Sequence, residues 1–460
     1  MFDIILLLYF VCVVLSNQAP LKLDIETRRS DGKELSQSYL EKRLGLSLPV
    51  SNQYSVYTTI LRMGSNRDPV RVILDTGSSD LWVMSSQVNC VSKNTEAKRE
   101  TIVDKILTGL NFKSQGEICT ENGAFNYLAS TSFVKNNTEP FSIGYIDGVT
   151  TKGFWGHDNV FFAGNSISNF SFAVAQETSS KIGVMGIGLA EAVSTNTKYK
   201  KQYENFPLKL KTSGIMNTTS YSIYMNSYSP PSFGAVLFGA IDHAKYSGNL
   251  TTVDIHNEAN SLARLRIPIS SIQVVNDQTD DPVTIVNKGP DVLLDTGCTY
   301  SRFPRDVVDG IAKEIGATYD TIQDDYYVDC DIASTLRLNF KGTPIDFPIN
   351  ELLRSAGDKC SLAIDVDENN SLSILGDNFL RRMYLYFDLD NKQISVAQAV
   401  YTDREDIEIV SENRDFQSQS QEVESEVKQE EKDKSSAGTH IFVPLLVLTL
   451  SLLFVLLFNV

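Results

Sequence analysis

The sequence has few of the residues on which nucleic-acid binding and metal chemistry depend. Its 460 residues include 41 lysines and arginines against 57 aspartates and glutamates, a formal net charge of −16. Because phosphate binding needs basic patches, this charge argues against a nucleic-acid partner. The four histidines show no ligand spacing with the cysteines, so we expect no metal site and no cofactor. The length allows a large core and two domains or lobes.

Cysteine is also scarce. Six are present, and Cys12 falls in an apolar N-terminal segment, which leaves five. Proximity along the chain favours Cys90–Cys119 and Cys330–Cys360, each closing a loop of about 30 residues that would constrain the unfolded chain. Five cysteines permit fifteen ways to make two bridges, so this pairing is a prediction. Cys298 would then be left over.

The N-terminal region is typical of a secreted precursor. Residues 1–19 are predicted to be a signal peptide, because a run of twelve apolar residues is followed by small residues. Secretion agrees with five N-x-S/T sequons, which are candidate glycosylation sites: Asn136, Asn169, Asn217, Asn249 and Asn369. Residues 20–43 are polar and end in Lys42-Arg43. This dibasic pair predicts a pro-segment removed by a processing protease, and a solvated charged turn is the alternative.

The C-terminal region changes in composition twice. Residues 402–440 hold twelve acidic and five basic side chains and almost no aromatics, so we expect a disordered acidic stalk. Residues 441–460 are strongly apolar. A transmembrane helix is one interpretation, but a run of eighteen residues without a charge, and with no basic residues after it, favours a GPI-anchor signal that is removed. The small residues before it place the attachment at Ser435 or Ser436.

Between these ends the pattern is mainly β, with a few short helices. Alternating, β-branched runs begin at Tyr54. Residues 91–118 interrupt them with a polar insertion loop. The spacing of Val307, Ile311 and Ile315 predicts a helix over 303–315, and 378–385 is a second candidate. We place the junction of two lobes at Gly248, with an N-terminal lobe over 44–245 and a C-terminal lobe over 246–401.

One short pattern occurs twice. Residues 72–83 read V-I-L-D-T-G-S-S-D-L-W-V, and V-L-L-D-T-G-C-T-Y follows 220 residues later. Each copy delivers an aspartate, Asp75 or Asp295, from an aliphatic strand into a glycine turn. A single D-T-G is weak evidence, since it can simply cap a turn. Two copies, spaced by half the body of the chain, predict a pair of carboxyls.

Two close carboxyls predict a hydrolytic chemistry. They cannot both ionise easily, so the pair shares one proton over the acidic pH range. One member can then deprotonate a water molecule while the other protonates a leaving group or polarises a carbonyl. No covalent intermediate is required.

These motifs resemble those of the pepsin-like aspartic proteases, over about residues 50–400. F-S-I-G-Y-I-D-G is similar to the family's flap, with Tyr145 as the flap tyrosine and Asp147 and Gly148 at substrate-backbone positions. I-G-V-M-G-I-G (182–188) and S-I-L-G-D-N-F-L (373–380) resemble the two segments that thread behind the catalytic loops. Y-V-D-C-D, around Cys330, resembles the C-lobe disulfide region.

The resemblance implies a bilobal pepsin-like acid protease fold, mainly β, with a central active-site cleft. It implies that Asp75 and Asp295 are the catalytic pair. The residues that it implies as their supports are Thr76, Gly77, Ser78, Trp82, Thr296, Gly297 and Cys298. The threonines would brace the two loops, Ser78 would hydrogen-bond Asp75, and Trp82 would support Tyr145. Polypeptide substrates, inhibition by pepstatin-type compounds and a monomeric catalytic unit are further expectations.

Some positions depart from the family pattern. Cys298 stands where the family usually has Thr or Ser hydrogen-bonded to the second aspartate, and a thiol is a weaker donor. Ile146 and Val149 replace the usual flap Gly and Ser, and Ile182 occupies a usual aspartate position. These departures leave a second hypothesis, a weakly active or inactive pepsin-fold protein that binds ligands or the cell wall.

The predicted pro-segment, interrupted N-lobe loop, acidic stalk and anchor signal together resemble the yapsin-type GPI-anchored fungal aspartic proteases. That subgroup implies a lipid-anchored enzyme on the extracellular face of the plasma membrane or in the cell wall. It would process or shed cell-surface proteins, often after basic residues. Asp147 is a candidate for attracting a lysine or arginine side chain of the substrate.

Overall fold

The computed structural model describes residues 20–29, 55–91, 119–145, 148–225, 233–257 and 261–411. Several predicted features lie outside these residues. They are the signal peptide, the processing pair Lys42-Arg43, most of the insertion loop, Asp147, most of the acidic stalk, Ser435 and Ser436, and the apolar C-terminal segment. The described residues are mostly strands, as the sequence predicts.

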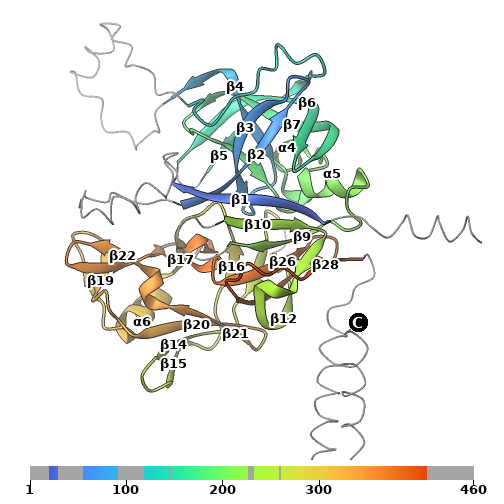
Figure 1. The fold of residues 1–460 in the computed structure, drawn as a ribbon. Coiled ribbons are helices and arrows are strands. Elements are labelled where there is room, and N and C mark those ends of the chain that lie inside the picture. Colours follow the sequence, from blue (N-terminus) through green and yellow to red (C-terminus); the bar gives the residue numbers. More distant parts are fainter. Residues whose placement is uncertain are drawn as a thin grey trace, which may run out of the picture. The chain divides into compact units, whose positions relative to one another are not determined.

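The N-terminal lobe is a layered array of strands joined by short helices (Figure 1). Its strands are β2 (Ser55–Met63), β3 (Asp68–Asp75), β4 (Leu81–Cys90), β5 (Val134–Gly144), β6 (Thr150–Phe162), β7 (Asn165–Thr178) and β8 (Gly183–Gly186). Its helices are η1 (Ala190–Ala192), α4 (Ser194–Tyr199) and α5 (Phe206–Thr212). Along β3, buried aliphatic residues alternate with more exposed ones and carry the chain inward to Asp75.

The C-terminal lobe contains three smaller sheets. The sheet that carries Asp295 consists of β13 (Arg266–Pro268), β16 (Asp291–Leu294), β17 (Ser301–Pro304), β24 (Ile364–Asp367) and β25 (Ser373–Leu375). The second consists of β14 (Ser271–Asn276), β15 (Pro282–Val286), β20 (Ser334–Phe340) and β21 (Thr343–Pro348). The third consists of β18 (Thr318–Asp320), β19 (Asp325–Val328), β22 (Leu353–Ala356) and β23 (Lys359–Leu362). Helices α6 (Arg305–Glu314), η3 (Ile349–Leu352) and α7 (Asp377–Leu380) connect them.

A continuous sheet joins the two lobes. Its order is β12-β27-β26-β9-β10-β1-β2-β3-β8-β4-β7-β6-β5. The strands not yet given are β1 (Leu21–Arg29), β9 (Ser220–Tyr224), β10 (Phe233–Phe238), β12 (Tyr246–Asp254), β26 (Met383–Asp388) and β27 (Gln393–Ala399). Beside it, β11 (Ala240–Asp242) pairs with β28 (Ile407–Ile409), and η2 spans His243–Lys245. Gly248, the expected lobe junction, lies inside β12 with φ of +72° where the register with β27 shifts.

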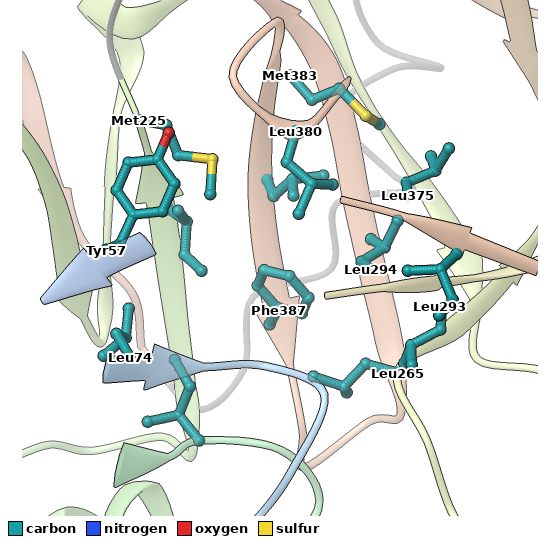
Figure 2. Packing of buried hydrophobic residues seen from close by; sticks show 14 of the residues in the cluster. Tyr57, Leu74, Met225, Leu265, Leu293, Leu294, Leu375, Leu380, Met383 and Phe387 are labelled. Atoms are coloured by element: carbon teal, nitrogen blue, oxygen red, sulfur yellow. The ribbon is translucent and has the colours of Figure 1, made fainter. Parts of the chain in front are cut away.

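The hydrophobic core continues across the joint between the lobes. Figure 2 shows Tyr57 and Leu74 of the N-terminal lobe on one side and Leu294 of the C-terminal lobe on the other, with Phe387 between them. All four side chains are at most 1% exposed and belong to one cluster. Burial of apolar area on this scale is the main stabilising contribution to the fold.

The two helix predictions have different outcomes. The helix expected over 303–315 is confirmed as α6, which buries Val307 and Ile311 on one face. The helix expected over 378–385 is wrong in length, since α7 ends at Leu380 and the chain enters the fully buried strand β26. A short, continuous apolar run is compatible with a buried helix or a buried strand. Here it forms a strand because β9 and β27 pair with it on both edges.

The predicted pro-segment begins with a strand that the sequence analysis missed. Strand β1 pairs with β10 from Leu21↔Phe238 to Glu26↔Phe233 and with β2 from Glu26↔Thr58 to Arg29↔Ser55. Leu21, Leu23 and Ile25 are buried. The alternation L-K-L-D-I-E carries the strand signal, but three apolar residues among charges read as a polar segment.

The acidic stalk begins later than predicted. Residues 402–411 belong to the folded body, because β28 pairs with β11 and Val410 is 3% exposed. The Asp406 N–H also donates to Asp242 Oδ1 at 2.8 Å. The predicted start of the stalk at residue 402 is therefore wrong, and residues 402–411 are part of the folded body. Charge composition alone does not reveal a three-residue strand. Among the described residues, no helix is long and apolar enough to cross a membrane.

A cluster of three buried polar side chains links the two lobes close to the catalytic loops. The Tyr57 hydroxyl, from β2, donates to Asp377 Oδ1, and the Arg381 guanidinium donates to Asp377 Oδ2. Both members of the ion pair are nearly inaccessible, with side-chain exposures of 7% and 2%. The Asp377 N–H in turn donates to the Cys298 carbonyl at 2.8 Å. The group therefore links the N-terminal lobe to the loop that carries Asp295.

We expect this group to be strongly coupled energetically. Arg381→Met should lower the free energy of unfolding by about 3–5 kcal/mol, because a buried carboxylate loses its counter-ion. Tyr57→Phe should cost about 1–3 kcal/mol through the loss of a buried donor. The double variant should cost less than the sum of the two. Urea titration of the four proteins measures the cycle, and strict additivity would contradict the coupling.

Candidate active site

Asp75 and Asp295 occupy equivalent positions in the two lobes. Asp75 ends β3, which runs parallel to β8 with Asp75 opposite Gly186. Asp295 follows β16, which runs parallel to β25 with Leu294 opposite Leu375. The Ile187 N–H donates to the Asp75 carbonyl at 2.9 Å, and the Asp295 N–H donates to the Leu375 carbonyl at 3.0 Å. The two segments expected behind the catalytic loops thus lie directly beside them.

Two threonines brace the loops against each other. The Thr76 hydroxyl donates to the Leu294 carbonyl at 2.6 Å, and the Thr296 hydroxyl donates to the Leu74 carbonyl at 2.8 Å. Each hydroxyl also accepts from the opposite backbone, with Thr76 N to Thr296 Oγ1 at 3.1 Å and Thr296 N to Thr76 Oγ1 at 2.9 Å. Both side chains are 1% exposed. Four buried hydrogen bonds therefore fix the spacing of the loops.

The two carboxyls contact each other across the joint. They are hydrogen-bonded to one another, and each accepts a backbone N–H from its own loop, Gly77 N to Asp75 Oδ1 at 2.8 Å and Gly297 N to Asp295 Oδ1 at 2.9 Å. A Cβ at Gly77 would lie 2.5 Å from Asp295 Oδ2, and one at Gly297 would lie 2.8 Å from Asp75 Oδ1. Glycine is required at both positions because each loop passes directly over the opposite carboxyl.

The electrostatics of the pair are asymmetric. Burial raises the pKa of Asp75, while hydrogen bonds from Ser78 and Gly77 oppose that rise. Burial, followed by the charge of Asp75, raises the pKa of Asp295 well above its usual range. The pair therefore retains one proton in the acidic range, with Asp295 the favoured holder.

Cys298 contributes to this asymmetry. The position equivalent to Ser78 in the second loop is Cys298, and its thiol donates to the Tyr300 carbonyl at 3.1 Å instead of to Asp295. Burial raises the pKa of the Cys298 thiol to about 12, so it remains protonated. Asp295 consequently lacks the hydroxyl donor that stabilises the Asp75 carboxylate.

Two of the expected flap residues, Tyr145 and Gly148, lie on the hairpin of β5 and β6. The Trp82 indole N–H donates to the Tyr145 hydroxyl at 2.7 Å, which positions the tyrosine beside the buried tryptophan. The turn closes through Gly148 N to Tyr145 O at 3.0 Å and Tyr145 N to Val149 O at 2.9 Å. Gly148 has φ of +82°, a conformation that favours glycine.

The structure contains both predicted disulfides, Cys90–Cys119 and Cys330–Cys360. The first closes the base of the insertion loop, and Cys298 remains a free thiol. Each sequon asparagine is exposed, which is compatible with glycosylation; they are Asn136, Asn169, Asn217, Asn249 and Asn369. Among the described residues, no cluster of three or more histidine, cysteine or acidic side chains is arranged to hold a metal ion.

One charged residue near the pair was missed by the sequence analysis. Arg264 precedes β13, and its guanidinium acts electrostatically on both Asp295 and Asp75. No motif marks it, since it lies 31 positions before Asp295, and the fold brings its neighbour Leu265 against Leu294, whose N–H donates to the Leu265 carbonyl at 3.1 Å.

The fold and this pair of braced aspartate loops define a class, and comparison with known proteins agrees with it. Residues 56–399 match the family model for eukaryotic aspartyl protease. The chain belongs to this family, the pepsin-like aspartic proteases.

Several fungal members are similar along most of their length. Secreted aspartic protease 10 of Candida albicans is 37% identical over 421 residues, covering 90% of this chain and 85% of that protein. Aspartic proteinase 3 of Saccharomyces cerevisiae is 33% identical, covering 79% of this chain and 73% of that protein. Yapsin-3 of the same yeast is 33% identical, covering 78% and 70%.

The asymmetry of the pair gives a pH prediction. Cys298→Thr should supply a hydroxyl donor to the Asp295 carboxylate and so lower its pKa. Activity of a proton-sharing pair is lost as the second proton leaves, so the upper limb of the pH profile should move to lower pH. Cys298→Ala adds no donor and should leave the limb in place. Profiles of kcat/KM for the three proteins test this, and an equal shift in both variants would contradict it.

Proposed function

We propose that this protein is a secreted, surface-anchored aspartic endopeptidase with Asp75 and Asp295 as its catalytic pair. The observation that carries the proposal is the contact between the two carboxyls, each held by a glycine N–H and braced by a threonine. Two carboxyls held in hydrogen-bond contact share a proton across the acidic range. Membership in the family gives polypeptides as the substrates.

The geometry supports acid–base hydrolysis without a covalent intermediate. A water molecule bound by both carboxyls loses a proton to the ionised Asp75 as its oxygen attacks the scissile carbonyl. The proton on Asp295 passes to the carbonyl oxygen, which gives a tetrahedral diol. The proton now on Asp75 then passes to the amide nitrogen, one diol hydroxyl returns its proton to Asp295, and the C–N bond breaks to give a carboxylic acid and an amine. Closure of the hairpin that bears Tyr145 would exclude bulk water from this sequence of steps.

The activity proposal is tested by cleavage of a peptide library. The full-length protein, purified from its expression host, should cleave peptides at acid pH and lose that activity with pepstatin. Asp75→Asn should lower kcat/KM by about 1,000-fold or more, because it removes the base and the shared proton. Asp281→Asn, at an exposed position between β14 and β15, makes the same change elsewhere and serves as the expression control. Absence of cleavage, or cleavage unchanged in Asp75→Asn, would contradict the proposal.

The same library tests the preference for basic residues. The support for that preference is the similarity to aspartic proteinase 3 and yapsin-3, together with the acidic side chain expected at the flap. Asp147 lies outside the described residues, so its part in the preference rests on the motif. Charge reversal at Asp147 that left a preference for lysine or arginine intact would remove this part of the proposal.

A second candidate function rests on Cys298. Because its thiol does not reach Asp295, the second loop lacks a donor that the first loop has. A binding or cell-wall role without catalysis would follow if the pair could no longer share a proton. Pepstatin-sensitive cleavage by the unmodified protein excludes this candidate.

The surface location is a separate proposal. Its support is the order of segments in the chain, namely a signal sequence, a catalytic body, an acidic segment and a terminal apolar tail. In expressing cells, a phosphatidylinositol-specific phospholipase should release the protein from membranes, and Ser435→Phe with Ser436→Phe should reduce that release. A retained transmembrane helix would leave the protein in the membrane fraction after the same treatment.

A further inference from the structure

A short helical segment lies against the open edge of the flap hairpin. We call residues 194–203 the α4 segment, since they contain α4 and the four residues that follow it. Strand β5, which leads to the flap tyrosine, is the last strand of the sheet and pairs only with β6 among the described strands. The outward carbonyls of such an edge strand have no partner within the sheet. They can therefore accept hydrogen bonds from a neighbouring segment.

The α4 segment makes three side-chain contacts with β5. The pairs are Lys198 with the Ser142 carbonyl, Tyr199 with the Pro140 carbonyl at 3.4 Å, and Lys201 with the Glu139 carboxylate. Residues 140 and 142 are two positions apart, so their carbonyls point to the same side of the strand. The lysine ammonium and the tyrosine hydroxyl thus satisfy consecutive outward carbonyls close to the flap end of β5.

Asp80 anchors the α4 segment to the first catalytic loop. Its buried carboxylate accepts the Ser194 N–H at 3.1 Å and the Tyr203 hydroxyl at 2.8 Å. Ser194 begins α4, and the residue before it, Val193, offers no side-chain cap. Asp80 therefore caps this helix from another part of the chain. Because a buried carboxylate is costly unless it is hydrogen-bonded, the loop and the segment stabilise each other.

Tyr203 also contacts the hairpin through an aromatic pair. Its ring centre lies 5.2 Å from that of Trp155, on β6, with 61° between the ring planes. Trp155 in turn packs edge to face on Phe141, on β5, at 5.2 Å. Trp155 and Phe141 share with Trp82 a hydrophobic cluster that is separate from the main core. The α4 segment thus contacts both strands of the hairpin.

We propose that the α4 segment is a brace that positions the flap hairpin, with Asp80, Lys198 and Tyr203 as positioning residues. The inference rests on the proposed protease function, because that function assigns closure over the substrate to this hairpin. A hairpin that is already ordered loses less conformational freedom when a peptide binds, so the peptide binds more tightly. The three residues act through the hairpin and take no part in the chemical steps.

Peptide cleavage tests the anchor of the brace. Asp80→Ala leaves two donors without their acceptor and should raise KM about 10-fold. It should leave kcat nearly unchanged, because the catalytic pair keeps its own hydrogen bonds. Asp80→Asn should restore KM, since a single oxygen, Oδ1, accepts from both Ser194 and Tyr203. The control is Asp158→Ala, which removes another buried, hydroxyl-bonded aspartate near the end of β6 remote from the flap and should leave KM unchanged.

A second pair of variants tests the contact with the edge strand. Lys198→Met removes the donor to the Ser142 carbonyl and should raise KM about threefold. Lys200→Met removes the same charge at an exposed position two residues further on and should leave KM unchanged. Adding Lys198→Met to Asp80→Ala should raise KM little further, because the brace has already lost its anchor.

Tryptophan fluorescence gives a readout that does not need catalysis. The chain has two tryptophans, Trp82 and Trp155, and both belong to the cluster that the hairpin covers. In the unliganded full-length protein, Asp80→Ala should increase the quenching of their emission by acrylamide. Asp80→Asn and Asp158→Ala should leave the quenching as it is. Urea unfolding of each variant shows whether Asp80→Ala and Asp158→Ala lose comparable stability.

Three results would overturn the inference while leaving the protease function in place. The first is an equal KM for Asp80→Ala and Asp158→Ala, and the second is an equal KM for Lys198→Met and Lys200→Met. The third is a fall in kcat at constant KM in Asp80→Ala, which would show that Asp80 acts on the catalytic loop itself. Failure of the unmodified protein to cleave any peptide would instead contradict the proposed function, and the quenching comparison would still test the brace.

Discussion

The exchange of hydrogen bonds between Thr76 and Thr296 is the constraint on which the site depends. Each threonine donates to a carbonyl of the opposite loop and accepts an N–H from it, so the loops have a single relative position. A buried network with every member satisfied is rigid, because any shift would leave a polar group unpaired in a low dielectric. The spacing of the two carboxyls follows from this network, and so does the sharing of a proton.

The two halves of the site are built alike but act differently. Asp75 and Asp295 both follow a short buried strand, turn over a glycine and accept that glycine's N–H. Asp75 receives a side-chain hydroxyl from Ser78, and within the described ranges no hydroxyl donates to Asp295. Burial and then the charge of Asp75 raise the pKa of Asp295, and the Cys298 thiol, which donates to the Tyr300 carbonyl, adds no hydrogen bond to oppose that rise.

Much of the site could be predicted because its residues lie in short, contiguous motifs. In each D-T-G motif the aspartate is the catalytic acid, the threonine bonds to the opposite loop and the glycine forms the turn. Each loop can therefore be recognised from three consecutive residues. The disulfides joined cysteines that are near in sequence. Arg264 carries no such signal, because the pairing of the adjacent strand β13 with β16 brings this part of the chain close to Asp295. A register is set by hydrogen bonds across the sheet, which a single sequence does not specify.

At two segments of the chain, charge composition predicts a polar or disordered segment where the structure has a strand. The composition of β1 is that of a polar segment because its five charged residues outnumber its three apolar residues, although the apolar residues alternate with period two. The first residues of the acidic stalk were assigned to a disordered segment in the same way, although Ile407–Ile409 forms a strand. Each of these charged segments forms a strand because a neighbouring strand pairs with it. Amino-acid composition does not show whether such a neighbouring strand exists.

The position of β1 has a consequence for processing at Lys42-Arg43. Strand β1 is paired on both edges, by β10 and β2, and buries Leu21, Leu23 and Ile25 in the common core. Its Lys22 side chain also forms an ion pair with Glu405 at 2.5 Å. A cut after Arg43 would break one peptide bond but none of these contacts. Release of the strand from the sheet therefore requires a second step, in which its hydrogen bonds to both neighbours are replaced.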